Sequence, residues 1–202
     1  MNVPNELLNR IVYFLSLKSV AKFNTVLNVY SLSTDEIKSL YSSKSYNIID
    51  AIESNNINYI KLLISYNINI EYSDSIYSCS NLQIAAISDK LEIAKILINA
   101  GANVNYCDRQ GDTPLIGAAR SGNKDIVELL IANGADINID GIYFCTPLFW
   151  ACNFNHKECV ELLIQSGANM NIRNDEGKTP IQIASQKGYN DIVDLLNKKM
   201  II

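Results

Sequence analysis

The sequence predicts an all-α protein of 202 residues, in which a solenoid of stacked helix pairs follows a small helical domain. Three observations predict this fold class. A motif recurs every 33 residues within residues 46–202, and such a period is typical of repeat solenoids. Each copy places apolar residues at helical spacing. Residues 1–45 do not share the period, but they carry short amphipathic segments of their own.

Several residue types keep the 33-residue period together. The motifs that recur are Thr-Pro at 113, 146 and 179, Leu-Leu at 129, 162 and 195, Gly-Ala at 134 and 167, and Asn at 105, 138 and 171. Weaker copies precede them, so five repeats are expected at about 46–71, 72–105, 106–138, 139–171 and 172–202. So many features held in register cannot be coincidental.

Each part of the repeat has a physical role. Threonine is a good N-cap, and proline fits the first helical turn because its missing N–H has no partner there. In the third copy a short helix follows Thr113, and Ser121-Gly122 ends it. The apolar spacing predicts a second helix over 124–132, and Gly134 supplies the left-handed residue that terminates it. The polar stretch up to the next Thr-Pro is long enough for a hairpin-like loop.

These motifs closely resemble those of ankyrin repeats. The resemblance covers about residues 46–198 and rests on Thr-Pro-Leu followed by Ala-Ala, and then on Gly-Ala-Asp-Ile-Asn. It implies helix-turn-helix-hairpin loop units stacked into a solenoid, with the loops projecting to one side. Each unit buries its apolar face on its neighbours, so the terminal units are expected to be atypical. The implied function is the binding of a target protein.

The N-terminal 45 residues resemble an F-box. The string from Val3 to Ile11 reads VPNELLNRI and is followed by Phe14-Leu15, while Tyr30 stands where the motif has Trp. The resemblance implies docking on the Skp-type adaptor of a cullin–RING ubiquitin ligase. The expected contact residues are Pro4, Leu8, Ile11, Phe14, Leu15 and Leu17. The alternative is that these helices only cap the first repeat, since 45 residues cannot bury so many apolar groups alone.

No catalytic, cofactor-binding or metal-binding residue is expected. The only histidine, His156, lies between Cys152 and Cys159, a spacing that suggests zinc. The repeat register favours a structural role instead, because Cys152 aligns with Ala119 and Cys159 with Ile126, both core positions. A nucleophile would also lack a second histidine to serve as a base.

The loop tips and the exposed ends of the first helices are the expected target-binding surface. In the fourth repeat Ile142, Tyr143 and Phe144 replace the polar tip residues of its neighbours, and apolar tips cost solubility unless a partner covers them. Packing between loops is the alternative. Trp150 is interpreted as core, with its ring compensating for the missing side chain of Gly117. The expected surface residues are Ile76, Tyr77, Arg109, Gln110, Asp112, Arg120, Ile142, Tyr143, Phe144 and Phe154.

Composition limits the expected partners and the expected cellular compartment. The net charge of −4, without blocks of like charge, argues against nucleic acid or membrane as a partner. An odd number of cysteines, five, and no apparent signal peptide indicate a reducing compartment, cytoplasm or nucleus. The 29 Ile and 25 Asn suggest an AT-rich genome, such as that of a large virus or an intracellular microbe acting in a host cell. We therefore expect a monomeric substrate receptor for a ubiquitin ligase, or a plain ankyrin-repeat scaffold.

Overall fold

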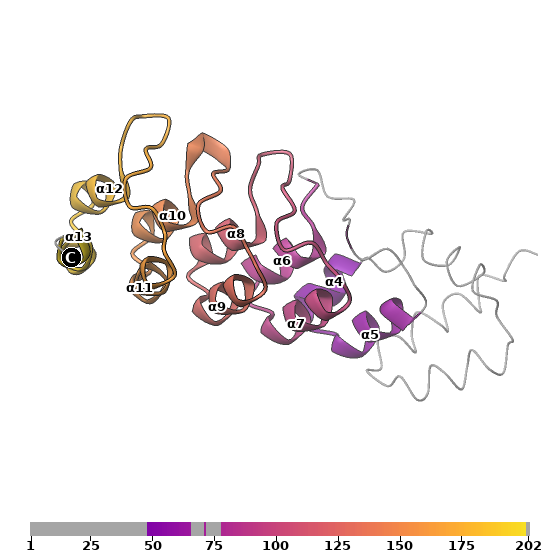
Figure 1. Ribbon diagram of the computed structural model, residues 1–202. Coiled ribbons are helices and arrows are strands. Elements are labelled where there is room, and N and C mark those ends of the chain that lie inside the picture. Colours follow the sequence, from indigo (N-terminus) through magenta and orange to yellow (C-terminus); the bar gives the residue numbers. More distant parts are fainter. Residues whose placement is uncertain (1–47, 66–70, 72–77, 201–202) are drawn as a thin grey trace, which may run out of the picture. The chain divides into compact units, whose positions relative to one another are not determined.

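The computed structural model describes residues 48–65, 71 and 78–200 (Figure 1). The chain divides into two units, residues 1–70 and 71–202. The expected F-box-like segment, residues 1–45, and the expected surface residues Ile76 and Tyr77 lie outside the described residues. The predictions made for them remain expectations.

In the first unit, two short helices form one antiparallel pair. Helix α4 (Ile48–Glu53) packs against α5 (Ile57–Ser65). Ile52 and Ile60 are completely buried, and Asn55 takes a left-handed conformation in the turn between the helices (φ 56°). This pair lies where the sequence predicts the first repeat.

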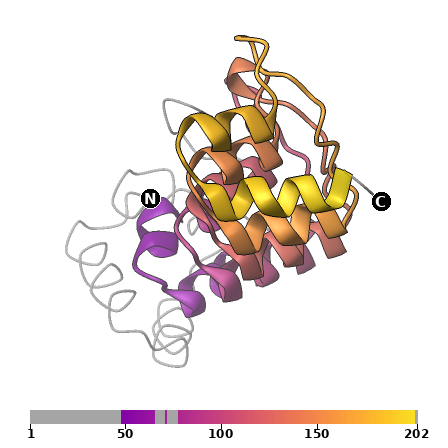
Figure 2. The same cartoon turned by 90° about the vertical axis from the view of Figure 1, so that its left-hand side faces the viewer.

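The described part of the second unit consists of four helix pairs and their loops, with no strand. The elements are α6 (Asn81–Ile87), α7 (Leu91–Asn99), α8 (Pro114–Ser121), α9 (Lys124–Ala132), the 3-10 turn η1 (Ile142–Phe144), α10 (Pro147–Asn153), α11 (Lys157–Gln165), α12 (Pro180–Gln186) and α13 (Asn190–Met200). Helices α6, α8, α10 and α12 pack side by side in one row, and α7, α9, α11 and α13 form a second row (Figures 1 and 2). The loops before α8, α10 and α12 project from the side of the first row.

The Thr-Pro motifs begin the first helix of each pair, as the sequence predicts. The hydroxyl of Thr113 accepts the backbone N–H of Ile116, and Thr146 caps the N–H of Phe149 in the same way. At α12 the cap is a capping box between Thr179 and Gln182. The three threonines are buried, so each cap satisfies a backbone group that water cannot reach.

The second helices end at left-handed glycines. Helix α9 has the bounds that the apolar spacing predicts, and Gly134 follows it with φ +84°. Gly101 and Gly167 hold the same position after α7 and α11, with φ +91° and +94°. The fold class of residues 78–200 therefore follows the prediction closely.

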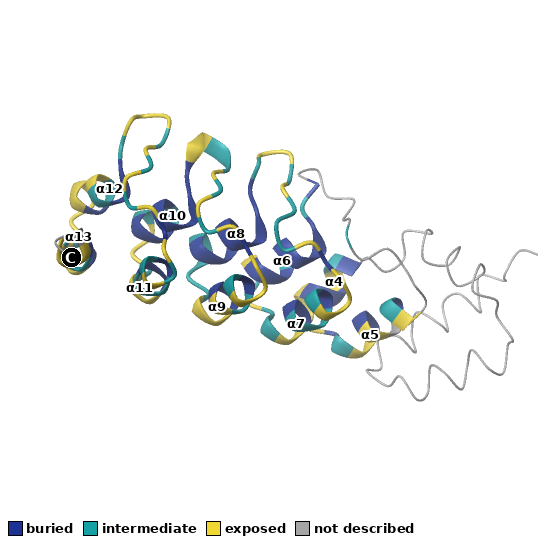
Figure 3. Cartoon of the chain, viewed as in Figure 1, coloured by how far each residue is buried: buried dark blue, intermediate teal, exposed yellow. Residues whose placement is uncertain are grey.

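The core lies between the two rows of helices, where Figure 3 shows the buried faces. Cys152 and Cys159 are buried there with no more than 1% of their surface exposed, as their alignment with Ala119 and Ile126 predicts. In the described residues no helix is long and apolar enough to cross a membrane.

Asparagines at the ends of the repeats link one repeat to the next. The side chain of Asn105 accepts the backbone N–H of Asp136 (2.8 Å) and donates to the carbonyl of Gly134 (3.1 Å). Asn138 accepts the N–H of Asn169 in the same way (2.8 Å). Asn105 and Asn138 therefore each connect one repeat to the next by hydrogen bonds.

The interpretation of Trp150 as a core residue is wrong in part. Its side chain is half-buried. The space beside Gly117 is filled by Ile87, because a Cβ on Gly117 would lie 2.9 Å from that side chain. Since Ile87 already occupies the gap, Trp150 is not needed there and lies partly on the surface.

Candidate protein-binding surface

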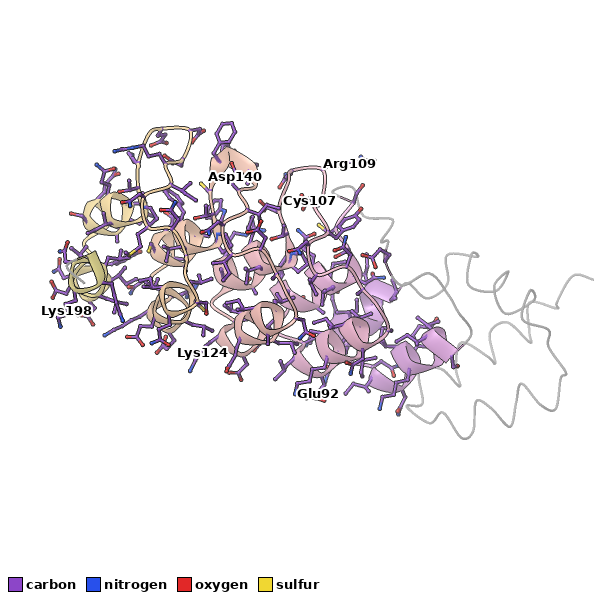
Figure 4. The ribbon with its side chains drawn as sticks, viewed as in Figure 1. Glu92, Cys107, Arg109, Lys124, Asp140 and Lys198 are labelled. Atoms are coloured by element: carbon purple, nitrogen blue, oxygen red, sulfur yellow. The ribbon has the colours of Figure 1, made fainter. Side chains whose placement is uncertain are left out.

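Three loops of the second unit end in tips built on one hydrogen-bond pattern. In the third repeat the N–H of Gly111 donates to the carbonyl of Asp108, and in the fifth Gly177 donates to Asn174. In the fourth, Phe144 donates to Gly141 at the same register (3.1 Å). The sequence period of 33 residues is thus repeated in the geometry of the tips. Figure 4 shows Arg109 and Asp140 on the loop side of neighbouring repeats, opposite Lys124 and Glu92 on the second helices.

The tip of the fourth repeat is unusual in its backbone. Gly111 and Gly177 have φ +80° and +74°, which glycine adopts without cost. Phe144 holds that position with φ 54°, and Tyr143 before it has φ 61°. Left-handed backbone at a bulky residue costs about 1–3 kcal/mol and is concentrated at functional sites. Folding alone therefore gives no reason for aromatic residues here.

These two aromatic side chains are the most exposed large apolar groups among the described residues. Tyr143 is 58% exposed and Phe144 62%. The backbone beneath them is held in place, because the Tyr143 carbonyl accepts the N–H of Asp175 from the next tip (3.0 Å). We call Tyr143 and Phe144 the aromatic tip. Such rings on an anchored loop are ready to bind a partner with little loss of conformational entropy.

The expectation that Asp112 lies on the surface is wrong, because its side chain is buried. One carboxylate oxygen accepts the N–H of Ile142, and the other pairs with Nη1 of Arg120 (2.8 Å). Gly141 packs so tightly on this carboxylate that a Cβ there would collide with it. Burial raises the pKa of Asp112, while the bond to Ile142 and the charge of Arg120 oppose that rise. Asp112 therefore supports the tip from below.

A second aromatic group lies near the C-terminal ends of α8 and α10. The guanidinium of Arg120 lies 5.6 Å from the centre of the Trp150 ring, and that ring stacks on Phe154 at 5.8 Å. Phe154 is 46% exposed. Arg120 is thus fixed by Asp112 on one side and by Trp150 on the other, so it serves as part of the scaffold as well as of the surface.

Two exposed carboxylates lie near the aromatic tip. Asp140 and Asp175 are exposed, and neither forms an ion pair with any residue that the structure describes. The same carboxylates act on the pKa of the buried thiol of Cys145. Its pKa is raised to about 12, mainly by burial and then by Asp175, Asp112, Glu176 and Asp140.

The remaining surface predictions can be placed as follows. Arg109 and Gln110 are exposed at the tip of the third repeat, and Ile142 is half-buried beneath the aromatic tip. The structure brings together Arg120 and Phe154 through Trp150, which sequence reasoning assigned to the core. The sequence offered no signal for this, because Trp150 aligns with the apolar residues Ile84 and Ile183.

The Cys-His-Cys spacing has a structural explanation. The Nε2 atom of His156 lies 3.1 Å from the carbonyl oxygen of Arg120. Its ring occupies the space that a side chain at Gly122 would need. Among the described residues no group of three or more His, Cys, Asp or Glu could hold a metal ion.

Comparison with known families identifies the repeats. A family model described as ankyrin repeats (3 copies) matches residues 48–141 and 142–201, which is most of the chain. No F-box model matches residues 1–45, and no curated protein matches the sequence. Ankyrin-repeat proteins are generally interaction scaffolds and not enzymes. With its helix pairs, capped starts and projecting loops, the chain belongs to the ankyrin-repeat family and is a scaffold that binds a protein partner.

Proposed function

We propose that the chain is a substrate-receptor adaptor of a ubiquitin ligase. In this proposal residues 1–45 bind the Skp-type adaptor of a cullin–RING ligase, and the ankyrin repeats hold a target protein. The chain itself makes and breaks no bond. It raises the effective concentration of the target near the transferred ubiquitin, which is a contribution of proximity alone.

The observation that carries the target-binding half is the aromatic tip. Tyr143 and Phe144 are 58% and 62% exposed on a loop whose backbone is anchored from both neighbouring repeats. Aromatic residues are enriched among the residues that dominate binding energy in protein interfaces. Arg109 and Gln110 at the preceding tip, and Arg120 with Phe154 at the helix ends, extend the proposed surface.

The adaptor-binding half rests on the sequence motif. Pro4 is followed by Glu6-Leu7-Leu8 and then by Ile11 and Phe14, the order that an F-box uses. A cap on the first repeat needs apolar faces but does not need this order of residues. The proposal places the chain in the cytoplasm or nucleus, and in a host cell for a viral or microbial source.

A calorimetric titration of the full chain with purified Skp-type adaptor tests this half. The wild type is expected to bind, and Leu8→Asp to lose binding because a carboxylate is buried at the contact. Asn9→Asp adds the same charge beside the proposed face and is the matched control, which is expected to bind like the wild type. Circular dichroism must show the same helical content in all three proteins. Absence of wild-type binding removes ubiquitin from the account.

The second candidate is an ankyrin-repeat scaffold without a link to ubiquitin. The observation in its favour is that the family match begins at residue 48 and no F-box model matches the preceding segment. In this case residues 1–45 cover the first repeat. Deleting them would then lower the melting temperature of the repeats, whereas loss of an F-box would leave it nearly unchanged.

A further inference from the structure

The chemistry of the aromatic tip indicates what kind of segment the target presents. Flat, electron-rich ring faces attract both apolar side chains and cations, and Lys or Arg over an aromatic ring gains from both. Tyr143 and Phe144 are both available for such contacts, with more than half of each side chain exposed. The rings alone do not distinguish an apolar partner from a cationic one. The charges around them do.

The carboxylates beside the aromatic tip form no ion pair with any described residue, whereas two cations of the fifth loop contact groups of that loop. Asp140 precedes the tip on its own loop, and the backbone of Asp175 is bonded to Tyr143. Neither carboxylate forms an ion pair within the described ranges. By contrast, Lys178 pairs with Glu176 (2.6 Å), and Arg173 donates to the carbonyl of Gly177 (2.7 Å).

Two arginines of the third repeat lie on the same side of the second unit. The guanidinium of Arg120 lies 2.8 Å from Asp112. Arg109 lies exposed at the preceding tip. The raised pKa of Cys145 agrees with a net negative field, because four carboxylates contribute to it after burial.

We propose that the aromatic tip and the carboxylates of Asp140 and Asp175 bind a basic segment of the target, with Lys or Arg beside apolar side chains. The inference rests on the proposed function for the target-binding half only. The basic groups neutralise the two carboxylates and cover the rings, and the apolar neighbours bury what remains of Tyr143 and Phe144. An acidic segment is repelled here, and a wholly apolar one leaves two carboxylates desolvated without partners.

A random 12-residue peptide library displayed on phage, selected against the full chain, tests the proposal. Peptides that also bind the double variant Tyr143→Asn/Phe144→Gly are removed. Asn and Gly are chosen for this variant because both tolerate the left-handed backbone of the tip. The expected peptides bind the wild type, fail on this variant, and combine Lys or Arg with apolar residues. Peptides that depend on the rings but lack Lys and Arg overturn the proposal. So does a selection that yields no ring-dependent peptide.

The role of charge is measured on the best synthetic peptide by fluorescence anisotropy at low salt. Asp140→Asn/Asp175→Asn keeps the shape of the surface and is expected to weaken binding about five- to tenfold. Glu128→Gln/Asp194→Asn removes two exposed carboxylates from α9 and α13 and is the matched control, expected to bind like the wild type. Equal affinity for both variants overturns the proposal. Because these substitutions are isosteric, the test stands even where the ring variant loses stability.

The two proposals can fail separately. Binding of the Skp-type adaptor depends on residues 1–45, and peptide binding depends on the fourth and fifth loops. A chain that binds basic peptides but no adaptor keeps this inference and loses the ubiquitin link. A chain that binds the adaptor but selects only acidic or apolar peptides keeps the ligase role and contradicts the inference.

Discussion

A carboxylate oxygen of Asp112 accepts a hydrogen bond from the backbone N–H of Ile142, one repeat further along the chain, at 3.1 Å. In the neighbouring loops a side chain at the start of the tip accepts a backbone N–H of the same loop. Asp108 accepts the N–H of Gln110 in the third repeat, and Asn174 accepts that of Glu176 in the fifth. The fourth loop has Gly141 at the position of Asp108 and Asn174, so it lacks this acceptor in its own loop and is held instead by Asp112 of the repeat before it.

Substitutions of Asp112 are expected to destabilise the folded chain by an amount that depends on which side chain replaces the carboxylate. Asp112→Ala leaves the Ile142 N–H without an acceptor and the Arg120 guanidinium without its counterion, so we expect a loss of about 2–4 kcal/mol. Asp112→Asn retains an acceptor for Ile142 and should cost clearly less. Urea unfolding followed by circular dichroism measures both. Equal losses would show that the contact with Ile142 contributes nothing.

The close packing of Gly122 against His156 predicts a large difference between two glycine substitutions. A Cβ on Gly122 would lie 2.5 Å from the imidazole, whereas nothing lies within 4 Å of one on Gly134. Both glycines have φ between +80° and +84°. Gly134→Ala therefore lowers the free energy of unfolding only through backbone strain, by about 1–2 kcal/mol. Gly122→Ala introduces the same strain and must also displace the imidazole ring of His156.

Thermal or urea unfolding of the two variants tests this difference. We expect Gly122→Ala to be less stable than Gly134→Ala by at least about 1 kcal/mol. In the combination with His156→Ala the extra loss should disappear, because the ring is no longer there to be displaced. An undiminished loss in the double variant would contradict the packing argument.

The strained aromatic tip predicts that a binding residue can be removed without a loss of stability. Phe144→Gly places glycine where Gly111 and Gly177 stand and relieves the left-handed strain. Because the side chain is 62% exposed, little packing is lost. The free energy of unfolding should stay the same or rise by up to about 1 kcal/mol. Phe144→Ala, which keeps the strain, is the comparison and should be less stable than Phe144→Gly.

The buried thiols predict a loss of stability in alkali. Burial raises the pKa of Cys152 from 9.0 to about 12 and, as the largest cause, that of Cys159 to about 11. Above pH 9 these thiols ionise in the unfolded chain but stay protonated in the folded one. Each then lowers the free energy of unfolding by about 1.4 kcal/mol per pH unit. The decline should continue until the folded thiols also ionise.

The control for this prediction is Cys152→Ala/Cys159→Ala. Tyrosine and lysine titrations affect both proteins alike, so the difference in slope isolates the two thiols. Denaturant unfolding between pH 8.5 and 10.5 should give a shallower decline for the variant. Parallel curves would contradict burial of these thiols in the folded state.

Most of the repeat architecture follows from the sequence because local signals and the 33-residue period agree. Thr113 and Thr146 cap helices, Gly134 ends one, and Cys159 takes the core place of Ile126, all by rules that act within one repeat. Those rules gave the bounds of α9 without error.

The errors concern contacts between repeats, which alignment of one repeat with another does not reveal. Asp112 precedes a Thr-Pro motif, as Cys145 and Lys178 do, and nothing local shows that its carboxylate binds the next loop. Trp150 was paired with Gly117 because they align, but Ile87 from the preceding repeat fills that space. Side-chain geometry across the stacked interface decides both cases.

The measurement that tests the central claim most directly is titration of Skp-type adaptor into wild type, Leu8→Asp and Tyr143→Asn/Phe144→Gly. If the chain joins a ligase at one end and a target at the other, wild type and the tip variant bind the adaptor equally, and Leu8→Asp does not. Absence of binding by the wild type would contradict the adaptor role. Loss of binding in the tip variant would contradict the separation of the two surfaces.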